Sequence, residues 1–145
     1  MRSMTEVVRL EKIGKNTVGE INALLAQLAP HYESVTPATL EKMIVHPDTE
    51  LLTVVDEEKI VGIATLIVMR KLSGISSQVE HVVIDEKYRG LGLGEALMKK
   101  LIERAGIRHA KTVVLTSRPA RAAANKLYQK LGFERKETNV YQMKL

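Results

Sequence analysis

The sequence predicts an α/β (α+β) protein in which helices flank a single mixed, mostly antiparallel sheet. Three observations predict this fold class. Two segments with helical periodicity precede a block of β-branched runs. Short polar turns separate those runs, as in hairpins, and two later helical segments alternate with strands, as in βαβ crossovers. The predicted order is therefore β-α-α-β-β-β-α-β-α-β, with both antiparallel and parallel pairs in one sheet.

The first third of the chain supplies a short strand and two helices. Residues 7–10 form a brief apolar run, and residues 18–29 carry apolar side chains at helical spacing before a proline. A second helix is expected from Thr36, because Pro37 suits the first helical position, and it stops at Pro47.

The middle of the chain changes to the two-residue period of strands. Residues 51–55 and 60–69 are rich in β-branched and apolar side chains, and the polar residues 56–59 lie between them. This pattern predicts a hairpin. Residues 78–84 are rich in valine and predict a further strand in the interior of the sheet.

Helices and strands alternate in the last third. Apolar side chains at helical spacing predict a helix over residues 92–105, ended by Gly106, and another over residues 119–131. Residues 112–115 are expected as a strand between them, and residues 140–145 as the strand that ends the chain.

Length and composition limit the class of protein. A chain of 145 residues is expected to form a single domain, residues 1–145, and 45% hydrophobic with 27% charged residues excludes a disordered chain. The sequence has no cysteine and no histidine pair at metal-ligand spacing, so neither disulfides nor a bound metal are expected. No apolar run could span a membrane, and residues 1–6 lack the apolar stretch of a signal peptide. We therefore expect a cytoplasmic protein without a membrane partner.

A net charge of +5 favours an anionic partner. One Phe, four Tyr and no Trp make a poor stacking surface for single-stranded nucleic acid. The basic residues are also spread along the chain rather than gathered into one arm. The composition therefore favours a phosphorylated small molecule and argues against nucleic acid.

Residues 88–95 carry glycines at three alternate positions between a predicted strand and a predicted helix. Glycine allows the backbone to approach a ligand closely, and N–H groups at the start of a helix bind anions. The G-x-G-x-G spacing fits neither the Rossmann fingerprint nor a P-loop. A tight turn with glycines for packing alone is the alternative, but Arg89 adds a charged donor and favours a pyrophosphate site.

These residues resemble the pattern Arg/Gln-x-x-Gly-x-Gly/Ala of the GCN5-related N-acetyltransferases, the GNAT family, which use acetyl-coenzyme A. Arg89, Gly92 and Gly94 match it, and residues 127–133 match a second family block. The resemblance covers residues 51–145 well, and before them only the plan of two helices agrees. It implies the acyl-CoA N-acyltransferase fold, with acetyl-CoA as cosubstrate.

The resemblance also implies where the cofactor binds. Backbone groups of the strand ending at Ile84 would hold the pantetheine arm, in an opening toward the strand around Leu115, and the glycine turn would hold the pyrophosphate. The implied cofactor-binding residues are Val82, Val83, Ile84, Arg89, Gly90, Leu91, Gly92, Leu93, Gly94, Glu95 and Asn125.

One position departs from the family pattern. Many members carry an Asn seven residues before the Tyr of the second block, and here that position is Arg121, with Asn125 out of register. Arg118 and Arg121 either meet cofactor phosphates or lie on a solvated helix face.

Glu80 and Tyr128 are the candidate catalytic residues. An alkylamine has a pKa of about 10, so a base must remove a proton near neutral pH. Glu80 interrupts an apolar strand, at a position where several family members place a carboxylate. Tyr128 lies in the second block and is the candidate acid for the departing thiolate. Alternatively, Glu80 faces solvent or only binds a cationic substrate. The alternative for Tyr128 is that it only packs in the core.

Histidines contribute little to the expected site. His81 neighbours Glu80 and is expected on the opposite sheet face, because side chains alternate along a strand. His31, with Tyr32 and Glu33, follows the first helix, where the resemblance implies a lid over the acceptor.

Three functions follow from these observations. The first is direct acetyl transfer to a primary amine of a small molecule, or to a protein amine. The family likeness also allows the protein to be a homodimer. The second is a non-catalytic module that binds coenzyme A as a sensor or scaffold. The third, a nucleic-acid-binding protein, rests on net charge alone and is the least favoured.

Overall fold

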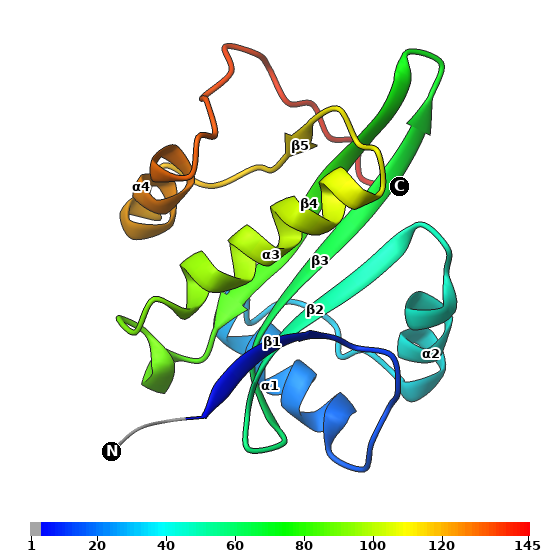
Figure 1. Ribbon diagram of the computed structural model, residues 1–145, viewed down its shortest axis with the longest axis vertical. Coiled ribbons are helices and arrows are strands. Elements are labelled where there is room, and N and C mark those ends of the chain that lie inside the picture. The colour runs from blue at the N-terminus through cyan, green and yellow to red at the C-terminus, as the bar shows by residue number, and fades with distance from the viewer. Residues whose placement is uncertain (1–3) are drawn as a thin grey trace.

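The computed structural model describes residues 4–145. Residues 1–3 lie outside the described part, and they make up half of the segment, residues 1–6, considered above as a signal peptide. The five described strands form one sheet in the order β1-β2-β3-β4-β5. Neighbouring strands are antiparallel except β4 and β5, which are parallel. Figure 1 shows helices on both sides of this sheet, so the predicted fold class is confirmed.

The elements lie close to the predicted segments. The strands are β1 (Thr5–Arg9), β2 (Thr49–Asp56), β3 (Lys59–Lys71), β4 (Gly74–Ile84) and β5 (Val113–Val114). The helices are α1 (Thr17–Leu28), α2 (Pro37–Val45), α3 (Leu93–Ile107) and α4 (Ala122–Lys130), with a short 3-10 helix at Glu86–Tyr88.

Local chemistry explains several element boundaries. Pro37 occupies the start of α2, and the Thr36 hydroxyl accepts a hydrogen bond from the Thr39 N–H, as an N-cap does. The β2–β3 hairpin turns at Glu57 and Glu58, both with positive φ (45° and 75°), the backbone of a tight hairpin turn whose twist suits the strands.

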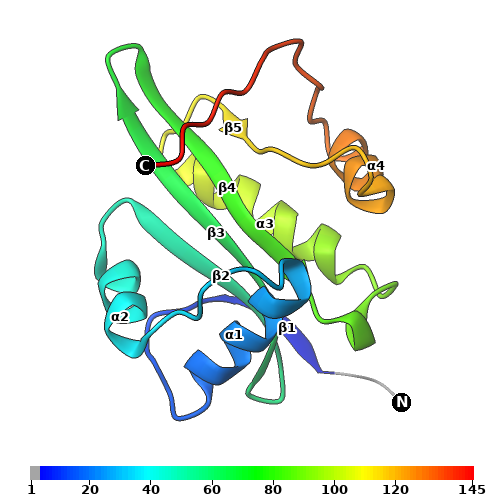
Figure 2. The same cartoon turned by 180° about the vertical axis from the view of Figure 1, so that it is seen from behind.

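Each face of the sheet has its own apolar core. On one face, α3 packs on the strands through Leu97, Met98 and Leu101, none of which is exposed. On the other, α1 and α2 bury Leu24 and Leu40 against β2, β3 and β4 (Figure 2). The alternation of side chains along β2 and β3 supplies both faces, and the sheet is therefore covered on both sides.

One predicted strand and two predicted helix boundaries are wrong. Residues 140–145 do not form a strand, because β5 offers only two paired residues and a strand needs a neighbouring edge to bond to. The last helix begins at Ala122, three residues late, because residues 118–121 form a turn instead. Helix α3 runs past Gly106 to Ile107, and His109, with φ of 63°, takes the left-handed conformation that the prediction gave to Gly106.

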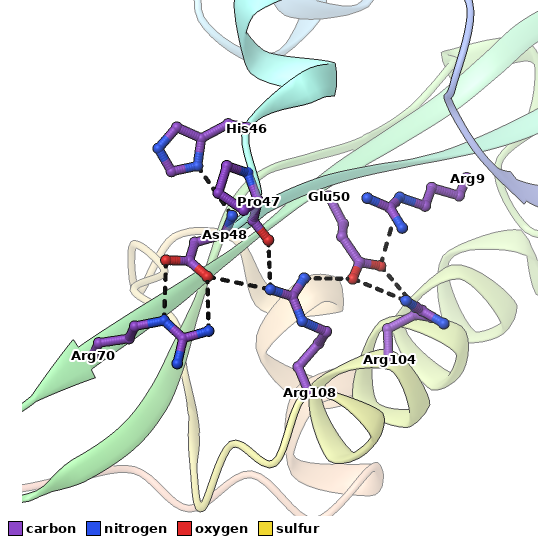
Figure 3. Close-up of polar contacts among 8 residues, drawn as sticks. All are labelled: Arg9, His46, Pro47, Asp48, Glu50, Arg70, Arg104 and Arg108. Atoms are coloured by element: carbon purple, nitrogen blue, oxygen red, sulfur yellow. Dashed lines mark hydrogen bonds and ion pairs between the residues drawn. The ribbon is translucent and has the colours of Figure 1, made fainter.

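A buried carboxylate fastens α3 to the sheet. Glu50 on β2 is 0% exposed, and its oxygens accept hydrogen bonds from Arg104 Nε (2.7 Å), Arg104 Nη2 (3.0 Å) and Arg108 Nη1 (2.9 Å). Arg9 on β1 lies 3.9 Å away, and Arg108 also reaches Asp48 at 3.2 Å, as Figure 3 shows. This cluster holds the C-terminal half of α3 against β2.

The charges around Glu50 determine its protonation. Burial by itself raises the pKa of Glu50, but hydrogen bonds from Arg104 and Arg108 and the nearby charge of Arg9 outweigh it and lower the pKa below 4.5. The carboxylate is therefore ionised at neutral pH and paired.

We expect Glu50→Gln to reduce the free energy of unfolding by about 3 kcal/mol, because removing one partner leaves buried charge uncompensated. Urea denaturation at pH 7 measures this. Glu103→Gln is the matched control on α3: its carboxylate meets only Lys100 at 3.5 Å on the surface, and the change should stay below about 0.5 kcal/mol. Equal losses in the two variants would contradict a structural role for the cluster.

The contribution of Glu50 to the free energy of unfolding should depend on pH. A carboxyl group whose pKa is lowered by folding stabilises the protein above its unfolded-state pKa, and this stability is lost as pH falls through the folded-state pKa. The difference in unfolding free energy between the wild type and Glu50→Gln should therefore be constant between about pH 6 and pH 8. It should shrink as the pH falls below 4.5. A difference that grows with acid would disprove the assignment.

Candidate active site

The sheet opens between its two parallel strands. β4 and β5 pair only at Ser77 with Val113 and at Gln78 with Val114. From residue 79 to residue 84, β4 stays bonded to β3, but no strand within residues 4–145 pairs with its other edge. Backbone N–H and C=O groups on such an edge need partners, so this edge is a place for an extended ligand.

A β-bulge lies at the start of this unpaired edge. Thr65 of β3 pairs with Glu80, but Ile63 pairs with Val83, so β4 carries one extra residue there. His81 has a φ of 53°, in the left-handed region that non-glycine residues rarely adopt. Such strain is frequently stored at functional sites.

The bulge reverses the faces of the strand. Val79 and Val83 lie four positions apart and would share a face in a regular strand. Instead Val79 packs in the core beside α3, and Val83 packs in the core beneath α1 and α2. The extra residue is the cause, since a shift by one residue turns every later side chain over.

The predicted orientation of His81 is therefore wrong. The His81 ring meets Tyr32 edge-on, with the ring centroids 5.4 Å apart, and Tyr32 meets His31 at 5.0 Å. Glu80, His81 and this aromatic pair border the same pocket. Glu80 is half-buried and accepts a hydrogen bond from the Gln78 side chain.

The pocket at the bulge has a volume of about 580 Å³. It joins the end of α1, the bulge and the segment that follows β5. Its lining consists of residues 28–32, 79–82 and 115–119 together with Arg121, Tyr128 and Val140. Both predicted catalytic residues, Glu80 and Tyr128, thus lie at one cavity.

Tyr128 comes to this pocket from α4. It is 6% exposed, packs in the core beside α3, and meets Phe133 edge-on at 5.9 Å. Burial raises the pKa of the Tyr128 hydroxyl, and the charge of Arg121 offsets part of that rise. The hydroxyl is therefore protonated at neutral pH and able to donate.

The glycine turn has the form expected for an anion site. Gly90 and Gly92 have φ values of 77° and 78°, and a Cβ atom placed on either would meet nothing within 4 Å. The first hydrogen bond of α3 runs from Ala96 N–H to the Gly92 carbonyl oxygen, so the preceding N–H groups have no partner within the helix. Open space beside Gly90 and Gly92, next to N–H groups without a partner in the helix, fits a diphosphate.

Side chains around the turn fix its position. Arg89 Nε donates to the Ile84 carbonyl oxygen at 3.1 Å, and the Tyr88 hydroxyl donates to Asp56 at 2.7 Å. The second contact raises the pKa of Tyr88. Glu95 pairs with Lys130 at 3.1 Å and Lys99 at 3.6 Å, and the hydrogen bond from Lys130 lowers its pKa.

The remaining predicted cofactor residues are divided among several places. Val82 and Ile84 face the core beside α3, and Val83 is buried on the opposite face. Leu91 is exposed and Leu93 is half-buried. The Asn125 side-chain amide donates to the carbonyl oxygens of residues 118 and 121, at 2.9 Å each, and closes the turn before α4.

The bulge and the approach of His81 to Tyr32 were not predicted from the sequence pattern. One signal was present: two consecutive polar residues, Glu80 and His81, interrupt the apolar residues of 79–84 and break the alternation in the way a bulge does. The burial of Glu50, a carboxylate directly before an apolar run, was not predicted either. Within the described part of the chain, no group of three or more His, Cys, Asp or Glu residues could hold a metal ion. Over residues 4–145, none of the helices has the length and apolar character of a membrane span.

Comparison with known proteins identifies the family. The sequence model of the Acetyltransferase (GNAT) family matches residues 20–133. The chain belongs to this family. The resemblance drawn from the glycine turn and the second block is thereby confirmed, and acetyl-CoA is the acetyl donor used in this family.

Curated relatives in this family match only a part of their own length. A stretch of 57 residues is 37% identical to N-acetylaspartate synthetase from Xenopus tropicalis, and it covers 39% of this chain and 21% of that protein. The chain thus spans about a fifth of the length of this relative.

Solved GNAT structures match over the whole chain. An acetyltransferase from Trypanosoma brucei is 28% identical with a TM-score of 0.79, covering 97% of this chain and 99% of that one. The aminoglycoside N-acetyltransferase AAC(6')-Iy in complex with CoA is 16% identical with a TM-score of 0.81, covering 99% and 97%. At 16% identity, the likeness to the aminoglycoside N-acetyltransferase shows a shared fold alone.

We expect Gly92→Ala to weaken CoA binding about tenfold, because an L side chain in the left-handed conformation costs roughly 1–2 kcal/mol and its Cβ would project into the open space over the turn. Titration calorimetry with CoA measures the dissociation constant. Gly106→Ala is the matched control: it lies inside α3 in open space and should leave CoA binding unchanged. Unchanged binding in Gly92→Ala would contradict the role of the turn.

Proposed function

We propose that the protein transfers an acetyl group from acetyl-CoA to a primary amine of a small molecule. The observation that carries this proposal is the arrival of Glu80 and Tyr128 at one pocket on the unpaired edge of β4. Membership of the GNAT family supports acetyl transfer. The name of the Xenopus relative, a synthetase of N-acetylaspartate, supports a small amine as acceptor.

Acetyl-CoA would lie along β4. The N–H groups of residues 91–95 would bind its diphosphate, at the positive end of the α3 dipole. The pantetheine arm would bond to the edge of β4 near Val82 and Ile84, which no strand of the described chain occupies. A backbone N–H near the bulge at Val82 and Val83 would polarise the thioester carbonyl.

Glu80 and Tyr128 would move the two protons of the reaction. The Glu80 carboxylate takes a proton from the amine, whose nitrogen then forms a bond to the acetyl carbonyl carbon. The C–S bond breaks, and the Tyr128 hydroxyl gives its proton to the thiolate, for which its protonated state at neutral pH is suited. The sequence has no cysteine to form an acetyl-enzyme, which favours direct transfer in a ternary complex.

We expect Glu80→Gln and Tyr128→Phe each to lower kcat by about 10²- to 10⁴-fold, the usual contribution of a general base or acid. A thiol-release assay with acetyl-CoA and a panel of amines measures this. The rate of Glu80→Gln should recover as the pH rises, because the amine, with a pKa of about 10, then loses its proton to solvent.

Tyr141→Phe and Glu103→Gln are the controls, since both side chains are exposed and lie outside the pocket. Both should keep wild-type kcat. If the wild type binds CoA but acetylates none of the amines, the sensor or scaffold function replaces the proposed one.

A further inference from the structure

Two arginines make the pocket at the bulge cationic. Arg118 and Arg121 line it, and Glu80 is the one carboxylate among its lining residues. The two histidines of the lining add no negative charge. A bound molecule therefore meets two positive charges and one negative charge.

These two arginines differ from most others in the described chain. Arg9, Arg70, Arg104 and Arg108 are all held by Glu50 or Asp48, and Arg89 donates to a carbonyl oxygen. The side chains of Arg118 and Arg121 are exposed and make no hydrogen bond or ion pair with any residue between 4 and 145. Their guanidinium groups are thus available to a ligand.

The backbone that carries the two arginines is held in place. The Arg121 N–H donates to the Arg118 carbonyl oxygen at 3.0 Å. The Asn125 side-chain amide donates to the carbonyl oxygens of Arg118 and of Arg121, at 2.9 Å each. Ser117, the preceding residue, also lines the pocket, and its buried Oγ has no hydrogen-bond partner in the described chain. A buried hydroxyl without a partner is costly unless a ligand or water satisfies it.

The location of the two arginines favours the acceptor over the phosphates of CoA. Their pocket includes residues 28–32 at the end of α1 but no residue of the glycine turn that would bind the diphosphate. The charge of Arg121 also lowers the pKa of the hydroxyl of Tyr128, the proposed acid, so this charge lies near the reacting groups. Both observations favour contact of the two arginines with the acceptor rather than with the phosphates of CoA.

We propose that Arg118 and Arg121 bind a carboxylate or phosphate of the acceptor, so that the acceptor is a small amine that also carries negative charge. The guanidinium fork matches the oxygens of either group. Glu80 then faces the amine and the arginines face the anion, which orients the acceptor across the pocket. This inference rests on the proposed function for the reaction, but the binding preference can be measured without turnover.

The test compares amines that differ only in an anionic group. Aspartate is set against its diamide, which carries no carboxylate, and glucosamine 6-phosphate against glucosamine, each titrated by calorimetry into protein saturated with CoA. In at least one pair, we expect the anionic member to bind the wild type about tenfold or more tightly. Arg118→Gln/Arg121→Gln should remove that preference and leave binding of the neutral member unchanged.

Arg135→Gln is the matched control, because Arg135 is exposed and lies outside the pocket. It should keep the wild-type preference. The double variant removes only exposed side chains without partners, so its melting temperature should equal that of the wild type, which separates lost binding from lost folding.

A second comparison distinguishes the acceptor from the cofactor. For any amine that is turned over, the double variant is assayed with acetyl-CoA and with S-acetylpantetheine, a donor that lacks the diphosphate and the nucleotide. A loss of kcat/KM that persists with both donors and only for anionic amines supports the inference. A loss that occurs with acetyl-CoA alone would overturn it, because the arginines would then bind cofactor phosphates.

The remaining outcomes are equally decisive. Equal binding of anionic and neutral amines, or no binding of any anionic amine, would overturn the inference. Selective binding of an anionic amine without acetylation would leave it standing and reject the proposed function instead.

Discussion

The parting of β4 from β5 after Gln78 is the constraint on which the proposed site depends. A continuous parallel pair would satisfy the backbone groups of both strands and leave no edge for a ligand. Because β5 pairs at only two residues, β4 keeps one bonded edge and one open edge over six residues, 79–84. The bulge then turns Glu80 and His81 toward the pocket beside the end of α1.

Helix α3 connects that edge with the anion site. Its first turn carries the unpaired N–H groups over Gly90 and Gly92, and its body packs on the sheet through Leu97 and Leu101. The buried Glu50 fastens its far end to β2. A helix held along its whole length cannot tilt freely, so the glycine turn keeps a constant position relative to the open edge of β4.

Positive charge is divided between these two sites in an unexpected way. The glycine turn offers backbone N–H groups, and Nε of Arg89 is engaged by the Ile84 carbonyl oxygen. Arg118 and Arg121, two arginines without hydrogen-bond or ion-pair partners in the described chain, lie instead at the pocket where the acceptor would react. Backbone dipoles would thus bind the diphosphate, and guanidinium groups are left to select the second substrate. The net charge of +5, which suggested an anionic partner, fits two anionic ligands rather than one.

The fold class, nearly every helix and strand and the glycine turn were predictable from the sequence, and so was the pair of Glu80 and Tyr128 as candidates, which the structure brings to one pocket. These follow from local periodicity and short motifs, which need no knowledge of distant neighbours. Long-range contacts set the position of the bulge, the absence of a final strand, the burial of Glu50 and the placing of Arg118 and Arg121 at the pocket. Each of these depends on register and contact between segments far apart in the chain: the bulge on pairing with β3, the final strand on an edge that β5 does not provide, and Glu50 on arginines 54 and 58 residues away.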